Sequence, residues 1–118
     1  MNAPTETGNW TTVTTLDDLW EGEMAPYTVD GVDVLLINSG GTIVAFEDKC
    51  PHAANPLSTG TLDDEELTCA AHSWTFDPLT GAGRNPATTC LKRYAVQVSD
   101  DAIQIDLTAV LTEAKSDS

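Results

Sequence analysis

Residues 50–72 contain two short pairs of side chains that can bind a metal. The first pair is Cys50-Pro51-His52, and after sixteen further residues the second pair is Cys69-Ala70-Ala71-His72. Each pair combines one thiol with one imidazole, so one loop presents two ligands to a metal centre and a second loop presents the other two. The sequence therefore predicts a metal site, and the rest of the chain is expected to hold these two loops.

Two kinds of metal centre fit four such ligands. A single zinc ion takes Cys and His in a closed tetrahedral site, whereas some iron-sulfur clusters replace two of their four thiolates by histidines. Zinc fingers usually pair Cys with Cys and His with His, two to five residues apart. The mixed pairs of this chain favour iron and sulfide, and a structural zinc module is the alternative.

The residues around the two pairs resemble those of Rieske [2Fe-2S] ferredoxins. The resemblance covers about residues 10–106 and is closest to the ferredoxin components of multicomponent diiron monooxygenases of the toluene and alkene type. Besides the ligand pairs, the residues that carry it are Pro56-Leu57-Ser58, residues 67–77, Thr80-Gly81 and Asn85-Pro86. The resemblance implies an all-β fold, an antiparallel β-sandwich with a small cluster-binding subdomain.

The same resemblance implies the division of the chain and its cofactor. The Rieske domain is expected over residues 9–106, with cluster-binding loops at about 47–86, a flexible N-terminus at 1–8 and a C-terminal tail at 107–118. One [2Fe-2S] cluster is expected, with Cys50 and Cys69 on one iron and His52 and His72 on the other. A third loop, residues 83–86, is expected to shield it.

The resemblance also indicates a low reduction potential. High-potential Rieske proteins tie their ligand loops with a disulfide, but the corresponding positions here are Asn55 and Ala71. Those proteins offer hydroxyl groups to the cluster sulfurs, where this chain has Trp74 and Phe76. Fewer hydrogen bonds to sulfur stabilise the reduced state less, so we expect a potential near the bottom of the Rieske range of about −150 to +300 mV.

The implied function is electron transfer and not catalysis. The expected partners are a flavin-dependent NAD(P)H reductase and the hydroxylase of a multicomponent monooxygenase that oxidises hydrocarbons. A ferredoxin component of an aromatic-ring dioxygenase would share all four ligands and is the second reading. Electrons are expected to leave near His52, His72 and Trp74, although Trp74 could equally serve as a packed aromatic that braces its loop.

The composition narrows the choice of partners and compartment. The 118 residues include 19 acidic and 5 basic side chains, a net charge of −14, which disfavours nucleic acid and anionic membranes as partners. Neither a secretory signal nor an apolar stretch of membrane-spanning length is visible, so a cytoplasmic location is expected. The third cysteine, Cys90, is expected to be a small buried side chain and not a ligand.

Local patterns predict mostly short strands. Asp30-Gly31 is a strong signal for a two-residue hairpin turn, and the triplet Leu35-Leu36-Ile37 indicates a strand buried on both faces. A helix is expected over residues 107–111. The predicted strands are residues 9–13, 24–29, 32–38, 42–46, 60–62, 66–68, 73–76, 93–98 and 103–105.

Overall fold

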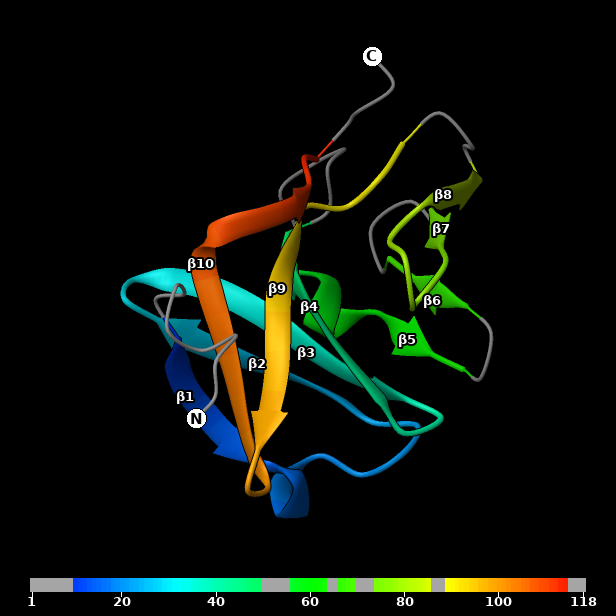
Figure 1. The fold of residues 1–118 in the computed structure, drawn as a ribbon. Coiled ribbons are helices and arrows are strands. Elements are labelled where there is room, and N and C mark those ends of the chain that lie inside the picture. Colours follow the sequence, from blue (N-terminus) through cyan, green and yellow to red (C-terminus); the bar gives the residue numbers. More distant parts are fainter. Residues whose placement is uncertain (1–9, 50–55, 64–65, 70–73, 86–88, 115–118) are drawn as a thin grey trace.

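In the computed structural model, residues 10–49, 56–63, 66–69, 74–85 and 89–114 are described. They form two antiparallel sheets and two short 3-10 helices, η2 (Leu16–Asp18) and η3 (Leu57–Thr59) (Figure 1). The large sheet has the order β1-β10-β9-β4-β3-β2 and the small sheet the order β5-β6-β7-β8. The large sheet consists of β1 (Thr11–Thr15), β2 (Met24–Val29), β3 (Val32–Ser39), β4 (Thr42–Glu47), β9 (Arg93–Ser99) and β10 (Ala102–Thr112). The small sheet consists of β5 (Thr61–Leu62), β6 (Leu67–Thr68), β7 (Thr75–Phe76) and β8 (Gly83–Asn85).

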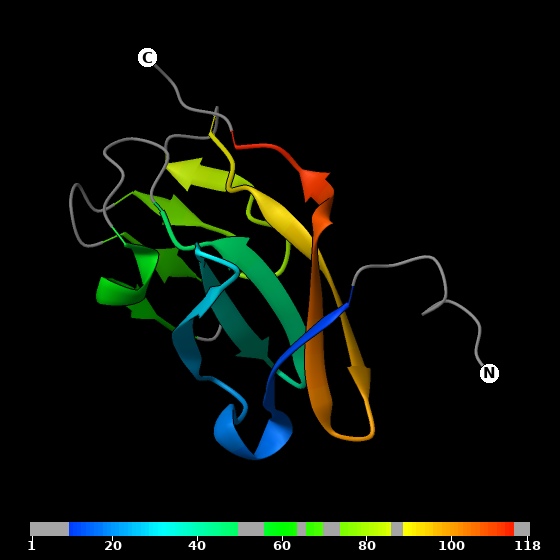
Figure 2. The ribbon, with the colours of Figure 1, turned by 90° about the vertical axis from the view of Figure 1, so that its left-hand side faces the viewer.

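The large sheet curls around its own apolar core. Val13 of the edge strand β1 and Val29 of the opposite edge strand β2 pack in the same cluster, together with Leu36, Ile103 and Ile105 of the central strands. A flat six-stranded sheet could not bring its two edges to one core. Figure 2 shows the resulting arrangement, in which β9 and β10 face β2 and β3. The predicted antiparallel sandwich is confirmed.

Three two-residue turns set the register of the long strands. Asp30 and Gly31 both have positive φ angles, of 50° and 80°, as a turn matched to the strand twist requires. Gly40-Gly41 and Asp100-Asp101 form turns of the same kind, and aspartate is one of the few non-glycine residues that tolerate this conformation. The hairpin turn predicted at Asp30-Gly31 is therefore confirmed, and Asp100-Asp101 connects β9 to β10 in the same way.

A second apolar cluster lies between the two sheets, and we call it the inter-sheet cluster. Strand β3 contributes to both cores, because Leu35 and Ile37 face the inter-sheet cluster whereas Val34 and Leu36 face the core of the large sheet. This confirms the prediction that β3 is buried on both faces. The members of the inter-sheet cluster are Leu35, Ile37, Val44, Phe46, Leu57, Leu67, Cys69, Phe76 and Leu91.

The C-terminal part of the prediction was wrong in one respect. Residues 107–111 are not helical, because β10 continues to Thr112 and pairs Val110 with Tyr94. The register shifts between Asp106 and Val110, so Leu107 and Val110 both reach the core of the large sheet. Their three-residue spacing imitates a helical pattern, but an irregular strand produces it here.

The helices of the described residues are single 3-10 turns, and none of them has the length or apolar character needed to span a membrane.

Gly81 lies in the turn between β7 and β8, and it contacts the segment that precedes β9. Its φ angle is +79°, and a Cβ atom built on it would lie 2.7 Å from Cε1 of Phe46 and 3.2 Å from Cβ of Leu91. Its N–H donates to the Asp77 carbonyl, and its own carbonyl accepts from the Leu91 N–H at 2.9 Å. A side chain at this position would therefore press against the inter-sheet cluster.

We expect Gly81→Ala to lower the free energy of unfolding by ~2–4 kcal/mol, because it combines left-handed backbone strain with overpacking. Gly22→Ala is the matched control, since Gly22 has a φ angle of +84° but no atom within 4 Å of a built Cβ. The control should lose only the strain, ~1–2 kcal/mol. Denaturant unfolding of both variants measures this, and equal losses would contradict the packing role of Gly81.

Candidate metal centre

The first ligand pair follows directly from the end of β4. We call residues 47–58 the first ligand segment; Cys50 and His52 lie outside the described residues, which resume at Pro56. The Glu47 N–H donates to the Lys92 carbonyl at 2.9 Å and the Asp48 N–H to the Asp33 carbonyl at 3.0 Å. The chain is therefore anchored to the large sheet up to two residues before Cys50.

The far end of the first ligand segment is anchored as well. Leu57 of η3 is fully buried in the inter-sheet cluster. The next residue, Ser58, donates its backbone N–H and its hydroxyl to the two carboxylate oxygens of Asp48, each at 2.8 Å. A buried carboxylate thus joins the two ends of the segment that carries Cys50 and His52.

Cys69, the first member of the second ligand pair, directly follows β6. We call residues 67–76 the second ligand segment; Leu67 pairs with Phe76 and Thr68 with Thr75. The Cys69 N–H donates to the Trp74 carbonyl at 2.8 Å, which extends the ladder by one step. The connection between Cys69 and Trp74, residues 70–73, includes His72 and lies outside the described residues.

Cys69 is the one predicted ligand that the described residues include, and its surroundings suit a metal thiolate. Its side chain is 1% exposed, free of any disulfide, and packed in the inter-sheet cluster. A soft thiolate shielded from water is a favourable ligand for an iron-sulfur cluster. The described residues contain no group of three or more potential ligands, and Cys50, His52 and His72 are not among them. Cys69 is therefore suited to bind an iron-sulfur cluster, and the full set of four ligands stays a prediction.

The predicted third loop is in part a strand. Gly83–Asn85 form β8 and pair with β7, and the Gly83 N–H donates to the Thr89 carbonyl at 2.7 Å. The expectation of a loop is therefore wrong for residues 83–85, and Pro86 lies outside the described residues. The resemblance implied a loop here, but Gly83 pairs with Phe76 and Asn85 with Thr75, so the segment continues the small sheet.

Trp74 lies within the second ligand segment, and Cys90 lies against Ala82, outside both ligand segments. Trp74 is half-buried and packs against the inter-sheet cluster, which leaves part of its ring accessible. Cys90 is half-buried rather than fully buried as expected, and its thiol donates to the Glu113 carbonyl at 3.1 Å. Cys90 pairs with Ala82 in an isolated antiparallel β-bridge, in the segment that precedes β9.

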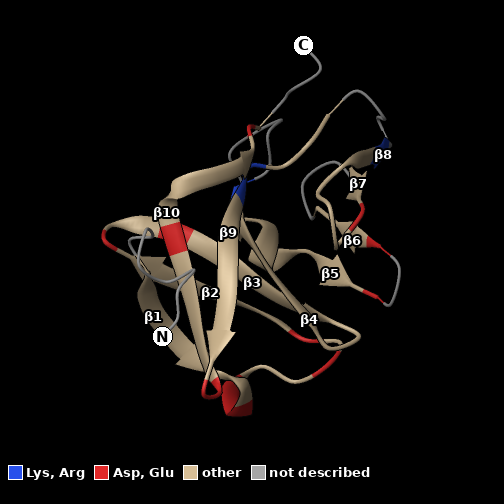
Figure 3. Ribbon diagram, viewed as in Figure 1, with Lys and Arg blue, Asp and Glu red and all other residues tan. Residues whose placement is uncertain are grey.

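The described cationic side chains lie on or next to β4, β8 and β9. They are Lys49, Arg84, Lys92 and Arg93, and acidic side chains lie both among the strands of the small sheet and in the turns at the opposite end (Figure 3). Arg84 lies 3.4 Å from Asp77 and 3.9 Å from Glu66.

Tyr94 of β9 is buried and lies near Lys92, Glu47 and Glu113. Burial, and then the carboxylates of Glu47 and Glu113, raise the pKa of Tyr94 above the ordinary value of a phenol. The Lys92 ammonium lies 5.8 Å from the centre of its ring. Tyr94 therefore stays neutral at physiological pH and adds no negative charge near the first ligand segment.

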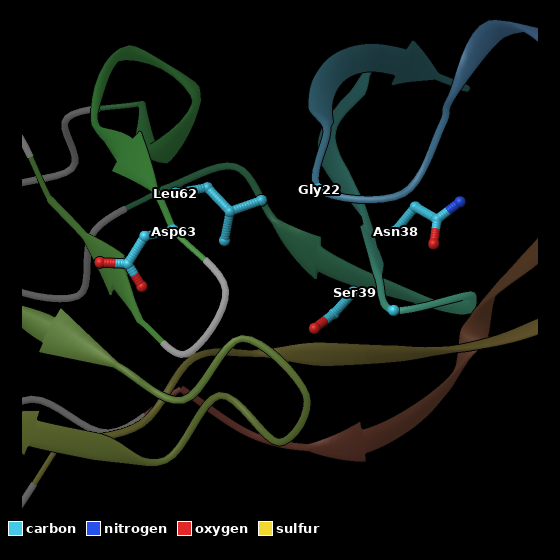
Figure 4. Close-up of a pocket in the computed structure, with 6 residues that line it drawn as sticks. Gly22, Asn38, Ser39, Leu62 and Asp63 are labelled. Carbon is cyan, nitrogen blue, oxygen red and sulfur yellow. The ribbon is translucent and has the colours of Figure 1, made fainter.

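Figure 4 shows a cavity where the β3–β4 turn meets the end of β5. It has a volume of about 140 Å³ and is lined by Gly22, Asn38, Ser39, Gly40, Leu62 and Asp63. Small-molecule sites usually measure about 300–1,000 Å³. This cavity has room for a few water molecules but not for an organic substrate.

Asp48 is the residue at the site that the sequence analysis missed. Its pairing with Ser58 joins residues ten positions apart across a loop, and no helical or strand period relates them. The two signals in the sequence are its place two residues before Cys50 and the position of Ser58 directly after Pro56-Leu57.

The chain is similar to a known domain family and to ferredoxin components of oxygenase systems. The model of the Rieske [2Fe-2S] domain matches residues 9–95. The ferredoxin component of an alkene monooxygenase system from Xanthobacter autotrophicus is 36% identical over 105 residues, which cover 88% of this chain and 86% of the relative. The ferredoxin component of a naphthalene 1,2-dioxygenase system from Pseudomonas putida is 32% identical over 102 residues, 86% of this chain and 98% of the relative.

A solved structure is similar over nearly the whole chain. It is described as the complex of reduced oxygenase and oxidized ferredoxin in carbazole 1,9a-dioxygenase, and one of its chains matches with a TM-score of 0.75 and 26% identity. The match covers 92% of this chain and 97% of that chain. From the family match over residues 9–95 and the near-full-length identity to two ferredoxin components, it follows that the chain belongs to the Rieske [2Fe-2S] domain family.

Proposed function

We propose that this protein is the electron carrier of a multicomponent oxygenase system. It takes single electrons from a flavin-dependent NAD(P)H reductase and passes them to the terminal oxygenase. The observation that carries the proposal is the 36% identity, over 88% of the chain, to the ferredoxin component of an alkene monooxygenase system. The similarity to a chain solved in an oxygenase–ferredoxin complex supports a terminal oxygenase as partner.

Four residues would hold the cofactor. Cys50 and Cys69 would bind one iron and His52 and His72 the other, and a [2Fe-2S] cluster with such ligands stores and releases one electron. The protein contributes the burial of Cys69 and the closure of both ligand segments. A structural zinc site, the alternative from another class, has no counterpart among the relatives reported above.

Two terminal oxygenases are candidates. The monooxygenase relative has the higher identity, 36% against 32% for the naphthalene dioxygenase component, and a hydrocarbon monooxygenase is therefore our first choice. An aromatic-ring dioxygenase is the second candidate, since the second relative matches over nearly the same share of the chain. Both assignments use the protein in the same way, as a carrier that binds no substrate.

The potential and the location complete the proposal. Phe76 is fully buried and Trp74 half-buried, and neither side chain has a hydroxyl group to offer a cluster sulfur. This supports a potential near the bottom of the Rieske range. We place the protein in the cytoplasm, where a reducing environment keeps cysteine thiols available as ligands.

Reconstitution tests the function directly. We expect NADH-dependent substrate oxidation when the purified protein is combined with a flavin reductase and a hydrocarbon monooxygenase, and no oxidation when it is omitted. The same assay with an aromatic-ring dioxygenase decides between the two candidates. A protein that restores turnover with neither oxygenase, although it is reduced by the reductase, would contradict the proposal.

Trp74 is the proposed exit for the electron, together with His52 and His72. An aromatic ring at a protein interface commonly contributes ~2 kcal/mol or more to binding, so Trp74→Ala should slow reduction of the oxygenase more than tenfold. The midpoint potential and iron content should stay unchanged. Stopped-flow absorbance of the reduced carrier mixed with oxidised oxygenase measures the rate.

Leu62→Ala is the control for lost packing, because Leu62 also packs against the inter-sheet cluster while half-buried. It should leave the transfer rate unchanged. Equal rates for Trp74→Ala and the unaltered protein, at equal cluster content, would show that Trp74 only braces its loop.

A further inference from the structure

We propose that Asp48 is a positioning residue that closes the first ligand segment around Cys50 and His52, an inference that rests on the proposed function. Its two carboxylate oxygens accept the backbone N–H and the hydroxyl of Ser58, each at 2.8 Å. Asp48 precedes Cys50 by two residues, and Ser58 follows His52 by six. We call this pair of hydrogen bonds the Asp48–Ser58 clasp.

The burial of Asp48 indicates that the clasp is a fixed part of the fold. The residue is 8% exposed, and a carboxylate removed from water is stable only when hydrogen bonds replace its hydration. Its own N–H donates to the Asp33 carbonyl at 3.0 Å, which holds it against the start of β3. The clasp therefore ties the loop to the large sheet and not merely to itself.

Asp48 also satisfies a requirement of η3. The first N–H groups of a helical turn have no partner within the turn, and the residue before η3 is Pro56, whose side chain makes no capping hydrogen bond. The carboxylate of Asp48 takes over this role from the other end of the loop. Leu57, the first residue of η3, is fully buried in the inter-sheet cluster and fixes the position of the turn.

The two ligand segments are closed by different means. The second segment is closed by a backbone ladder that ends in the hydrogen bond from Cys69 to Trp74. In the first segment, no strand pairing joins the described ends, Glu47–Lys49 and Pro56–Ser58, and the carboxylate of Asp48 links them instead. Hydrogen bonds to an ionised carboxylate are about twice as strong as neutral ones. Loss of the clasp should therefore loosen the half of the centre that Cys50 and His52 supply.

Two variants break the clasp in different ways. Ser58→Ala removes the hydroxyl and keeps the charge of Asp48, whereas Asp48→Asn removes the charge and leaves one oxygen for two donors. Thr14→Ala is the control, because the Thr14 hydroxyl makes the same kind of bond to Asp18, at 2.6 Å and exposed, outside both ligand segments. The measurements on the full-length holoprotein are the rate of cluster loss to an iron chelator, the EPR g values and the midpoint potential.

We expect both clasp variants to lose the cluster faster, by about tenfold for Asp48→Asn, which corresponds to ~1.4 kcal/mol. The reduced-state EPR lines of both should shift or broaden, a change that a general loss of stability would not produce. Thr14→Ala should match the unaltered protein in all three measurements.

An unchanged rate of cluster loss and unchanged EPR lines in Ser58→Ala would overturn the clasp. A raised potential in Asp48→Asn would not rescue it, because that result would show only that the charge of Asp48 acts on the cluster. If Asp48→Asn does not fold, Ser58→Ala alone carries the test. An unaltered protein without iron and sulfide would instead overturn the proposed function.

Discussion

The apolar contact between the large and the small sheet is the interaction on which the candidate metal centre depends. The strands of the small sheet are two or three residues long, and a net backbone hydrogen bond contributes only about 0.5–1.5 kcal/mol. Burial of one Leu or Phe side chain contributes ~1.5–3 kcal/mol, and Leu57, Leu67 and Phe76 are all fully buried. Packing on β3 and β4, more than the ladder, therefore fixes the small sheet in place.

This packing holds together the two ligand segments, which are separated by residues 59–66. Leu57 belongs to the first ligand segment and Leu67 to the second, and both enter the inter-sheet cluster. The thiol of Cys69 lies in the same cluster, so the packing that holds the subdomain also shields a metal ligand from water. Stability and cofactor binding thus depend on the same set of side chains, and a rigid scaffold keeps reorganisation small when an electron arrives.

The charge distribution adds a second constraint, on recognition. The chain carries a net charge of −14, and even the described cation Arg84 lies within 4 Å of two carboxylates, those of Asp77 and Glu66. A surface of this charge is attracted to basic patches on a partner and can meet them faster.

Sequence reasoning predicted the parts of the molecule that local patterns specify. The Asp30-Gly31 turn, the doubly buried run at Leu35 and the all-β class follow from short-range chemistry, and the structure confirms them. Tertiary effects account for the rest: β8 forms where a loop was expected, because β7 lies beside it. Residues 107–112 form a strand because they pair with β9. The Asp48–Ser58 clasp joins residues ten positions apart, and no helical or strand period relates them.

The most direct test of the account is a pulsed EPR measurement of nitrogen coupling in the reduced protein, with and without ¹⁵N-labelled histidine. The chain contains 2 histidines, His52 and His72, so the label can report on no other imidazole. If both histidines bind the cluster, we expect a rhombic signal at two irons per chain and two nitrogen couplings that both change on labelling. A signal that labelling leaves unchanged, or a colourless protein with one zinc ion, would contradict it.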